Sequence, residues 1–159
     1  MTHVNHSDTD FLHDLLHLLR GCLRAADLAG RVSVDPWTRS AALDSALASR
    51  REITEVATCL DEWELAGFAT PRSETPMSAD VALVDALEAD LAGRSGVDFD
   101  AQFIRVLLAH HHAMIGRSRQ EVIEGLSKRG RDIAVLAISE HSAGISAAER
   151  RLAALTQAS

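Results

Sequence analysis

The chain has 159 residues, a formal net charge of −7 at pH 7, and a composition that is 47% hydrophobic but only 4% aromatic, with no tyrosine. This length suits one domain whose core is large enough to fold without disulfide or metal staples. The abundance of alanine and leucine favours helices over sheets. Lysine and arginine residues are scattered among a larger number of acids, which argues against binding to a nucleic-acid backbone.

The opening segment, MTHVNHSDTDFLHD, lacks the basic start, apolar core and cleavage site of a signal peptide. No uninterrupted apolar run approaches the roughly 20 residues that cross a membrane. We therefore expect the chain, as given, to be cytoplasmic and to have no membrane contact. Cys22 and Cys59 are too far apart for a zinc or redox motif, so reduced thiols in the core are expected.

The first helix hairpin is predicted over residues 8–65. Its first helix runs from near Asp8 to a stop at Gly30, and Asp35 followed by Pro36 predicts the start of the second helix. The apolar periodicity places inward residues on both helices. These are Leu12, Leu15, Leu16, Leu19, Cys22 and Leu23 on the first helix, and Ala46, Ile53, Val56, Leu60 and Trp63 on the second.

A long crossover is predicted over residues 66–99, because its first part is rich in glycine and proline. Within it, Ser78 is a candidate cap and Gly93 a stop signal, which together predict a short helix over 78–92.

The second helix hairpin is predicted over residues 100–157. Its helices run from about 100 to 124, with Gly125 as the end signal, and from about 131 to 155. Four long helices and a short one, with two short loops and one long crossover, predict an all-α, ferritin-like four-helix bundle. We expect it to be a single domain over residues 1–159.

An internal repeat relates the two hairpins, because an ungapped shift of 92 positions aligns them across both loops. The aligned identities are Asp8 with Asp100, Phe11 with Phe103, Leu15 with Leu107, Leu16 with Leu108, Arg39 with Arg131, Ala42 with Ala134, Ile53 with Ile145 and Leu60 with Leu152. The first hairpin has leucine at the positions that correspond to His110 and His111, and serine at that of His141. Any histidine chemistry is therefore expected in the second hairpin.

Three consecutive histidines end the apolar stripe that begins at Phe103. At 3.6 residues per turn, His111 falls near the middle of this stripe, whereas His110 and His112 fall at its borders and are expected to be flanking or solvated. His141 also falls on an inward face, and it is about as far from the loop between the two helices as His111 is. We therefore predict that His111 and His141 face each other, with ring nitrogens close enough to share one ion or one water.

Other side chains could complete a metal site around these two imidazoles. A combination of imidazole with thioether or thiolate suits copper better than hard cations, which prefer oxygen. The candidate metal ligands are His111, His141, His110, Met114, Glu140 and Cys22. His13 and His17 lie opposite the leucine stripe and are expected to face solvent or a partner. No Glu-x-x-His motif for a di-iron centre is present.

The segment that leads into the histidines resembles the signature FD-x-x-FL-x-x-MI-x-HH-x-x-AI of the domain-of-unknown-function 305 family. The matches are Phe99-Asp100 for FD, Phe103-Ile104 for FL, Leu107-Leu108 for MI and His110-His111 for HH. The first hairpin is similar to the same pattern more faintly, through Asp10-Phe11-Leu12, Leu15-Leu16, and Arg51-Glu52-Ile53 for the family's Q-x-x-EI.

This resemblance covers nearly the whole chain and implies a ferritin-like bundle, commonly exported, with copper binding through His and Met in some members. The chain departs from the pattern at several of the positions that would bind metal. The departures are Leu15 and Leu107 at the methionines, Leu18-Leu19 at the first HH, and His141-Ser-Ala-Gly144 at the second Q-x-x-E.

Three functions stay open at this point. The first is a small metal-binding protein, with copper as the expected metal and a His-centred site in the second hairpin. The second is a metal-free scaffold or partner-binding bundle, in which His111 and His141 bond each other or a buried water. The third is a metal-dependent enzyme of a specialised pathway, for which no catalytic residue can be named. A homo-oligomer or a protein partner is compatible with all three.

Overall fold

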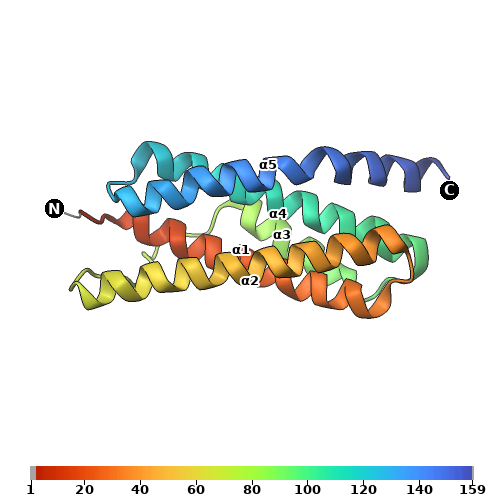
Figure 1. Ribbon diagram of the computed structural model, residues 1–159, viewed down its shortest axis with the longest axis horizontal. Helices are drawn as coiled ribbons and strands as arrows, with labels where there is room; N and C mark the ends of the chain where they lie inside the picture. The colour runs from red at the N-terminus through yellow and green to blue at the C-terminus, as the bar shows by residue number, and fades with distance from the viewer. Residues whose placement is uncertain (1–2, 159) are drawn as a thin grey trace.

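The computed structural model describes residues 3–158, which form five α-helices and no strands (Figure 1). The helices are α1 (His6–Val32), α2 (Pro36–Leu65), α3 (Ala79–Leu91), α4 (Gly96–Glu124) and α5 (Lys128–Gln157). The four long helices form a bundle of two hairpins, α1 with α2 and α4 with α5, joined by a crossover that contains α3. The predicted all-α four-helix architecture is confirmed.

Polar caps fix where the helices begin. Asn5 and Asp8 form a reciprocal capping box at the start of α1, and the Asp35 side chain accepts from the backbone of α2, whose first residue is Pro36. Ser127 caps α5 in the same way, so this helix begins at Lys128, earlier than predicted. Ser78 occupies the N-cap position of α3, but its side chain makes no capping hydrogen bond.

Three of the four pairs of helix ends in the two hairpins are separated by the 92 positions expected from the repeat, whereas α1 and α4 begin 90 positions apart. Both ends of α5 lie 92 positions after the ends of α2, and α1 and α4 end 92 positions apart. The repeat itself stays a prediction, because similar helix lengths also arise without one.

The helices do not pack evenly around the bundle. α1 packs against α4 at its centre, and α3 lies over both of them on one side. On the opposite side, α2 and α5 run next to each other without packing along their length. No helix among the described residues is apolar over a stretch long enough for a bilayer.

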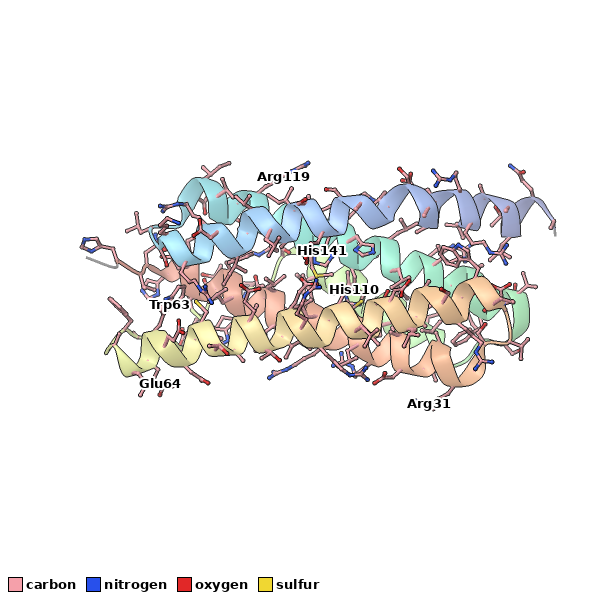
Figure 2. All side chains as sticks on the ribbon, in the orientation of Figure 1. Arg31, Trp63, Glu64, His110, Arg119 and His141 are labelled. Atoms are coloured by element: carbon pink, nitrogen blue, oxygen red, sulfur yellow. The ribbon has the colours of Figure 1, made fainter. Side chains whose placement is uncertain are left out.

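Two apolar clusters fill the interior. The first joins large side chains of α1 with Trp63 of α2, two valines of α3, Met114 of α4 and Ile133 of α5. The second lies toward the other end of the bundle, where alanines of α1 and α2 pack against Phe99, Phe103 and Leu107 of α4. His110 and His141 lie near the middle of the bundle in the side-chain view, between these two clusters (Figure 2).

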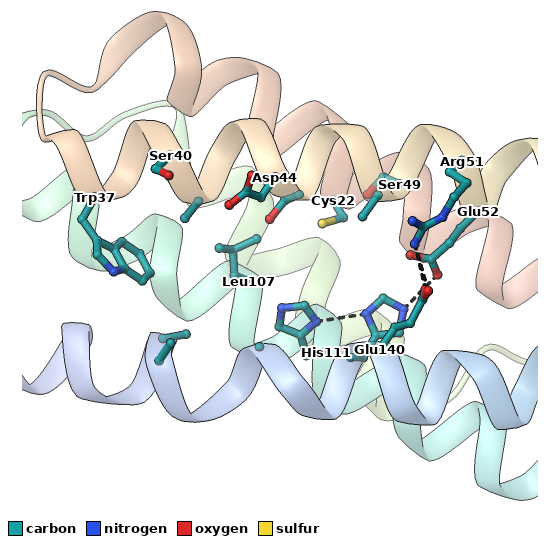
Figure 3. Close-up of a pocket in the computed structure, with 17 residues that line it drawn as sticks. Cys22, Trp37, Ser40, Asp44, Ser49, Arg51, Glu52, Leu107, His111 and Glu140 are labelled. Carbon is teal, nitrogen blue, oxygen red and sulfur yellow. Dashed lines mark hydrogen bonds and ion pairs between the residues drawn. The ribbon is translucent and has the colours of Figure 1, made fainter.

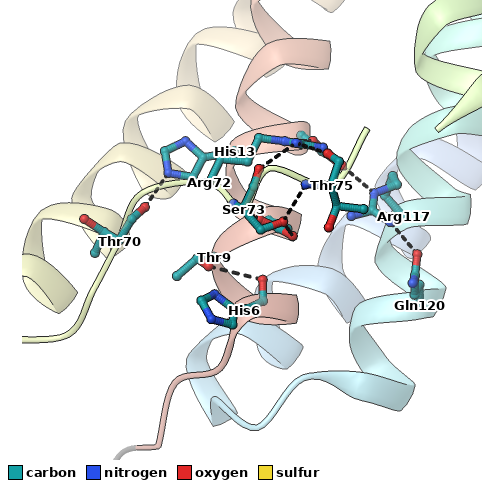
Figure 4. Close-up of polar contacts among 11 residues, drawn as sticks. His6, Thr9, His13, Thr70, Arg72, Ser73, Thr75, Arg117 and Gln120 are labelled. Carbon is teal, nitrogen blue, oxygen red and sulfur yellow. Dashed lines mark hydrogen bonds and ion pairs between the residues drawn. The ribbon is translucent and has the colours of Figure 1, made fainter. Parts of the chain in front are cut away.

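Hydrogen bonds hold the start of the crossover against α1 (Figure 4). Nε2 of His13 donates to the carbonyl of Thr70 over 2.6 Å, and both the backbone N–H and the hydroxyl of Ser73 donate to Asp10. The expectation that His13 faces solvent or a partner is therefore wrong, because the crossover covers this side of α1. His17 is half-exposed, and its Nε2 lies 2.8 Å from Oδ1 of Asp85 of α3.

A buried carboxylate joins the crossover to α4. One oxygen of Asp14 accepts a hydrogen bond from Arg72 at 2.8 Å, the other forms an ion pair with Nε of Arg117 at 2.9 Å, and the Asp14 side chain is only 2% exposed. This shared carboxylate ties α1, the crossover and α4 together.

Candidate functional site

His111 of α4 and His141 of α5 face each other in the interior of the bundle (Figure 3). Their Nδ1 atoms are 3.1 Å apart, and their ring centroids are 5.2 Å apart with the planes tilted by 42°. His141 is buried and His111 half-buried. The predicted approach of these two rings is confirmed, because both fall on inward faces at the same level of an antiparallel helix pair.

Glu52 of α2 is a third member of this group. Nε2 of His141 lies 3.1 Å from Oε2 of Glu52, and both side chains are buried. Sequence reasoning did not select Glu52 as a site residue. A signal for it existed, since Glu52 is one turn from Ser49, the position that aligns with His141 under the 92-residue shift.

The hydrogen bonds determine where the protons lie when both rings are neutral. An ionised carboxylate only accepts, so Nε2 of His141 carries the N–H and its Nδ1 carries the lone pair. Nδ1 of His111 then donates to that lone pair. Burial, followed by the charge of His141, lowers the pKa of His111 to about 4, which keeps the His111 ring neutral at neutral pH.

Gly144 of α5 makes room for His111. A Cβ atom at this position would lie 3.1 Å from Nε2 of His111, closer than ordinary van der Waals contact. Gly144 stands where the family's Q-x-x-E pattern has glutamate, and the His111 imidazole packs beside it.

His110 lies on a different side of α4. It is 1% exposed, its Nε2 is 3.9 Å from Oε2 of Glu88 on α3, and a Cβ atom at Gly21 of α1 would lie 2.9 Å from its ring. Neither ring nitrogen has a hydrogen-bond partner among the described residues, and burial lowers the pKa of His110 to about 3. The expectation that His110 is a flanking or solvated group is wrong, because α3 packs over this border of the helix and buries the ring. His112, in contrast, is exposed as expected.

The other three candidate ligands are placed as follows. Met114 belongs to the first apolar cluster and does not line the space around His111 and His141. Glu140 lines that space but forms an ion pair with Arg51, at 3.0 Å from each of its two oxygens. Cys22 also lines it, and burial raises the pKa of its thiol to about 11. Among residues 3–158, no three His, Cys, Asp or Glu side chains gather as a metal site.

The histidine pair opens into a cleft of about 530 Å³ between α2 and α5 (Figure 3). Its walls are mostly small side chains, with Trp37 near one end and the group of His111, His141 and Glu52 near the other. The lining residues are Cys22, Trp37, Ser40, Ala41, Asp44, Ser45, Ala48, Ser49, Arg51, Glu52, Leu107, His111, Glu140, His141, Gly144, Ala147 and Ala148.

Comparisons with known proteins agree with this architecture. The family model described as domain of unknown function (DUF305) matches residues 8–152. A solved DUF305 fragment from Deinococcus radiodurans is 19% identical, with a TM-score of 0.79 over 94% of this chain and 97% of that one. A DUF305 protein from Streptomyces coelicolor, provisionally described as secreted, is 16% identical, with a TM-score of 0.78 over 94% of each chain.

Structures of CopM are also similar. Its Cu(I)-bound form is 20% identical to this chain, with a TM-score of 0.68 over 90% of this chain and 93% of that one, and Cu(II)-bound, silver-bound and apo forms match as well. At these identities the likeness establishes the fold alone. A search of curated proteins finds no match.

Proposed function

The chain belongs to the DUF305 family, and from this premise we propose that it is a small copper-binding protein in which His111 and His141 hold the metal. The observation that carries the proposal is the meeting of their two Nδ1 atoms at 3.1 Å. Metal–nitrogen bonds of about 2.0–2.1 Å place two imidazole nitrogens on one tetrahedral ion roughly 3.3 Å apart, so the observed separation fits a shared ion.

Glu52 supports the same proposal. Histidine ligands commonly donate their other ring N–H to a carboxylate, which fixes the tautomer and makes the ligating nitrogen more basic. The hydrogen bond from Nε2 of His141 to Glu52 is of this kind, and it leaves the lone pair of Nδ1 of His141 available to bind the metal.

The donor set favours copper over hard cations. Two imidazole nitrogens suit copper, whereas magnesium and calcium require several oxygen ligands. CopM, which shares the fold, has been solved with Cu(I), Cu(II) and silver. His111 and His141 are the two protein ligands of the proposed site. We propose that water or another small ligand in the cleft completes the coordination of the metal.

A metal-free bundle is the second candidate function, and the same distance favours it. A separation of 3.1 Å is also that of a direct hydrogen bond between two imidazoles, and within residues 3–158 no third protein ligand completes a metal site with them. In that case the Glu52–His141–His111 chain is a polar link between α2, α5 and α4 and binds no ion.

Copper titration of untagged, metal-free protein by calorimetry separates the two candidates. Metal binding predicts one saturable site that is lost in His111→Ala and weakened in His141→Gln, while His13→Ala, which changes a histidine bonded to the crossover, binds copper as the parent does. A structural role predicts no saturable site in any of the four proteins. Circular dichroism of each variant confirms that the helices are retained.

A further inference from the structure

Ion pairs at two points bridge α2 and α5 and leave an open interval between them. Arg151 donates to Asp35 over 2.6 Å at one point, and Arg51 donates to Glu140 at the other. Residues 35 and 51 are separated by about 24 Å along a helix axis. Over this interval most of the facing residues are alanine, serine or glycine, which are too small to fill the space between the helices.

The size of the cleft is that of a small-molecule site. Its volume of about 530 Å³ falls within the range of roughly 300–1,000 Å³ found for ligand pockets, which are mainly apolar with a few polar groups. Ala41 and Ala48 of α2, Leu107 of α4, and Ala147 and Ala148 of α5 provide apolar wall.

The unpaired charge in the cleft is negative. Four acidic or basic residues other than histidine line it: Asp44, Arg51, Glu52 and Glu140. Arg51 and Glu140 neutralise each other, and Glu52 accepts from His141. Asp44 has no ion pair or hydrogen bond among the described residues, and its carboxylate points into the cleft (Figure 3). A cationic ligand is therefore favoured over an anionic one.

An aromatic ring stands on the same side of the cleft as this carboxylate. Trp37 and Asp44 are seven residues apart on α2, which places them two turns apart on one helix face, and both line the cleft. Indole rings attract cations through their π face, and they also pack against apolar ligand bodies.

We infer that the α2–α5 cleft binds a small organic amine whose protonated nitrogen pairs with Asp44 and whose aromatic or apolar body lies between Trp37 and the alanine walls. This site goes beyond the proposed copper function and does not depend on it. The binding measurement is therefore made on metal-free protein with a chelator present.

The test compares three probes of similar size by calorimetry and by NMR of the tryptophan indole N–H signals: 2-phenylethylamine, 2-phenylethanol and 3-phenylpropanoate. We expect saturable binding of the amine, several-fold weaker binding of the alcohol, and the weakest binding of the carboxylate. The indole signal of Trp37 shifts on binding, whereas that of Trp63, which is buried in the first apolar cluster, stays in place.

Variants locate the site. Asp44→Asn lowers the affinity for the amine about two- to five-fold, the range of an exposed ion pair, and removes the preference for the amine over the alcohol. Asp61→Asn, an exposed change on α2 outside the cleft, leaves both unchanged.

Ala48→Leu fills the cleft and abolishes binding. Ala147→Leu, on the exposed part of the opposite wall, has the same effect and replaces Ala48→Leu in the test if that variant does not fold. Equal binding of the three probes, a fixed Trp37 signal, or full binding by folded Ala48→Leu and Ala147→Leu proteins would overturn the inference.

Discussion

Nε2 of His141 and Oε2 of Glu52 lie 3.1 Å apart and join the second hairpin to the first by a buried hydrogen bond. The same imidazole reaches His111 through its other nitrogen, so a chain of three side chains crosses from α2 through α5 to α4. Glu52 therefore determines which nitrogen of His141 carries the proton, and with it which nitrogen can bind a metal ion.

Removing this carboxylate should weaken copper binding without unfolding the bundle. Glu52→Ala leaves Nε2 of His141 without its acceptor, and we expect about a 10–100-fold loss of copper affinity, the usual effect of losing such a partner. Glu52→Gln keeps an acceptor oxygen and should recover part of the loss. Glu55→Ala, on the same helix but without a contact to His141, serves as the control in calorimetric titrations. Unchanged affinity in Glu52→Ala would show that the carboxylate does not position the ligand.

Gly144 and Gly116 make a matched pair of helical glycines. A Cβ atom at Gly116 meets nothing within 4 Å, so Gly116→Ala should raise the free energy of unfolding by roughly 0.5–1 kcal/mol through helix propensity. Gly144→Ala should gain less than this or lose stability, because its methyl group presses on His111, and its copper affinity should fall several-fold. Denaturant unfolding and copper titration measure the two effects. Equal gains in stability with unchanged copper binding would contradict the proposed role of Gly144.

His110 should be dispensable for copper, although it precedes His111 in the sequence. Its ring is buried between α1, α3 and α4, and neither nitrogen has a hydrogen-bond partner among the described residues, so the imidazole costs stability relative to an apolar side chain of similar size. His110→Leu should bind copper as the parent does and should be at least as stable at pH 7 in denaturant unfolding. Loss of copper uptake in this variant would place His110 in the metal site instead.

Glu121 should make stability fall as the pH rises. Burial, helped by the neighbouring Asp8, raises the pKa of Glu121 from 4.5 to about 8. Between these two values the folded state keeps a proton that the unfolded state loses, so this group lowers the free energy of unfolding by about 1.4 kcal/mol per pH unit. The cost is absent below about pH 4.5 and complete above about pH 8.

Glu121→Gln should therefore stabilise the protein at pH 8–9 and have little effect near pH 5. Urea unfolding at several pH values measures the difference between parent and variant. Glu124→Gln, an exposed change one turn away, should leave the pH dependence as it is. A variant whose advantage does not grow with pH would mean that Glu121 ionises normally in the folded protein.

The fold could be predicted from local signals. The Asp35-Pro36 cap indicated the start of α2, and the apolar periodicity indicated both hairpins, because each helix start and each inward face depends on residues close in the sequence. The meeting of His111 and His141 was also predictable, since two antiparallel helices joined by a short loop place residues equally far from it at the same level.

The positions of the other site residues could not be predicted, because they depend on packing between segments far apart in the sequence. A helical wheel gives the direction of a side chain about its own helix but not which neighbour lies there. His110 is covered because α3 returns over α4, and Met114, which is equally inward, enters the first apolar cluster and not the cleft. Glu52 reaches His141 from the other hairpin, a pairing that depends on how the two hairpins dock.

Copper-edge anomalous scattering from crystals of copper-loaded protein tests the central claim most directly. The proposed site predicts one dominant peak between the Nδ1 atoms of His111 and His141, absent from crystals of His111→Ala grown in the same way. A dominant peak at His13, His17 or His112, or none in the bundle interior at saturating copper, would contradict it.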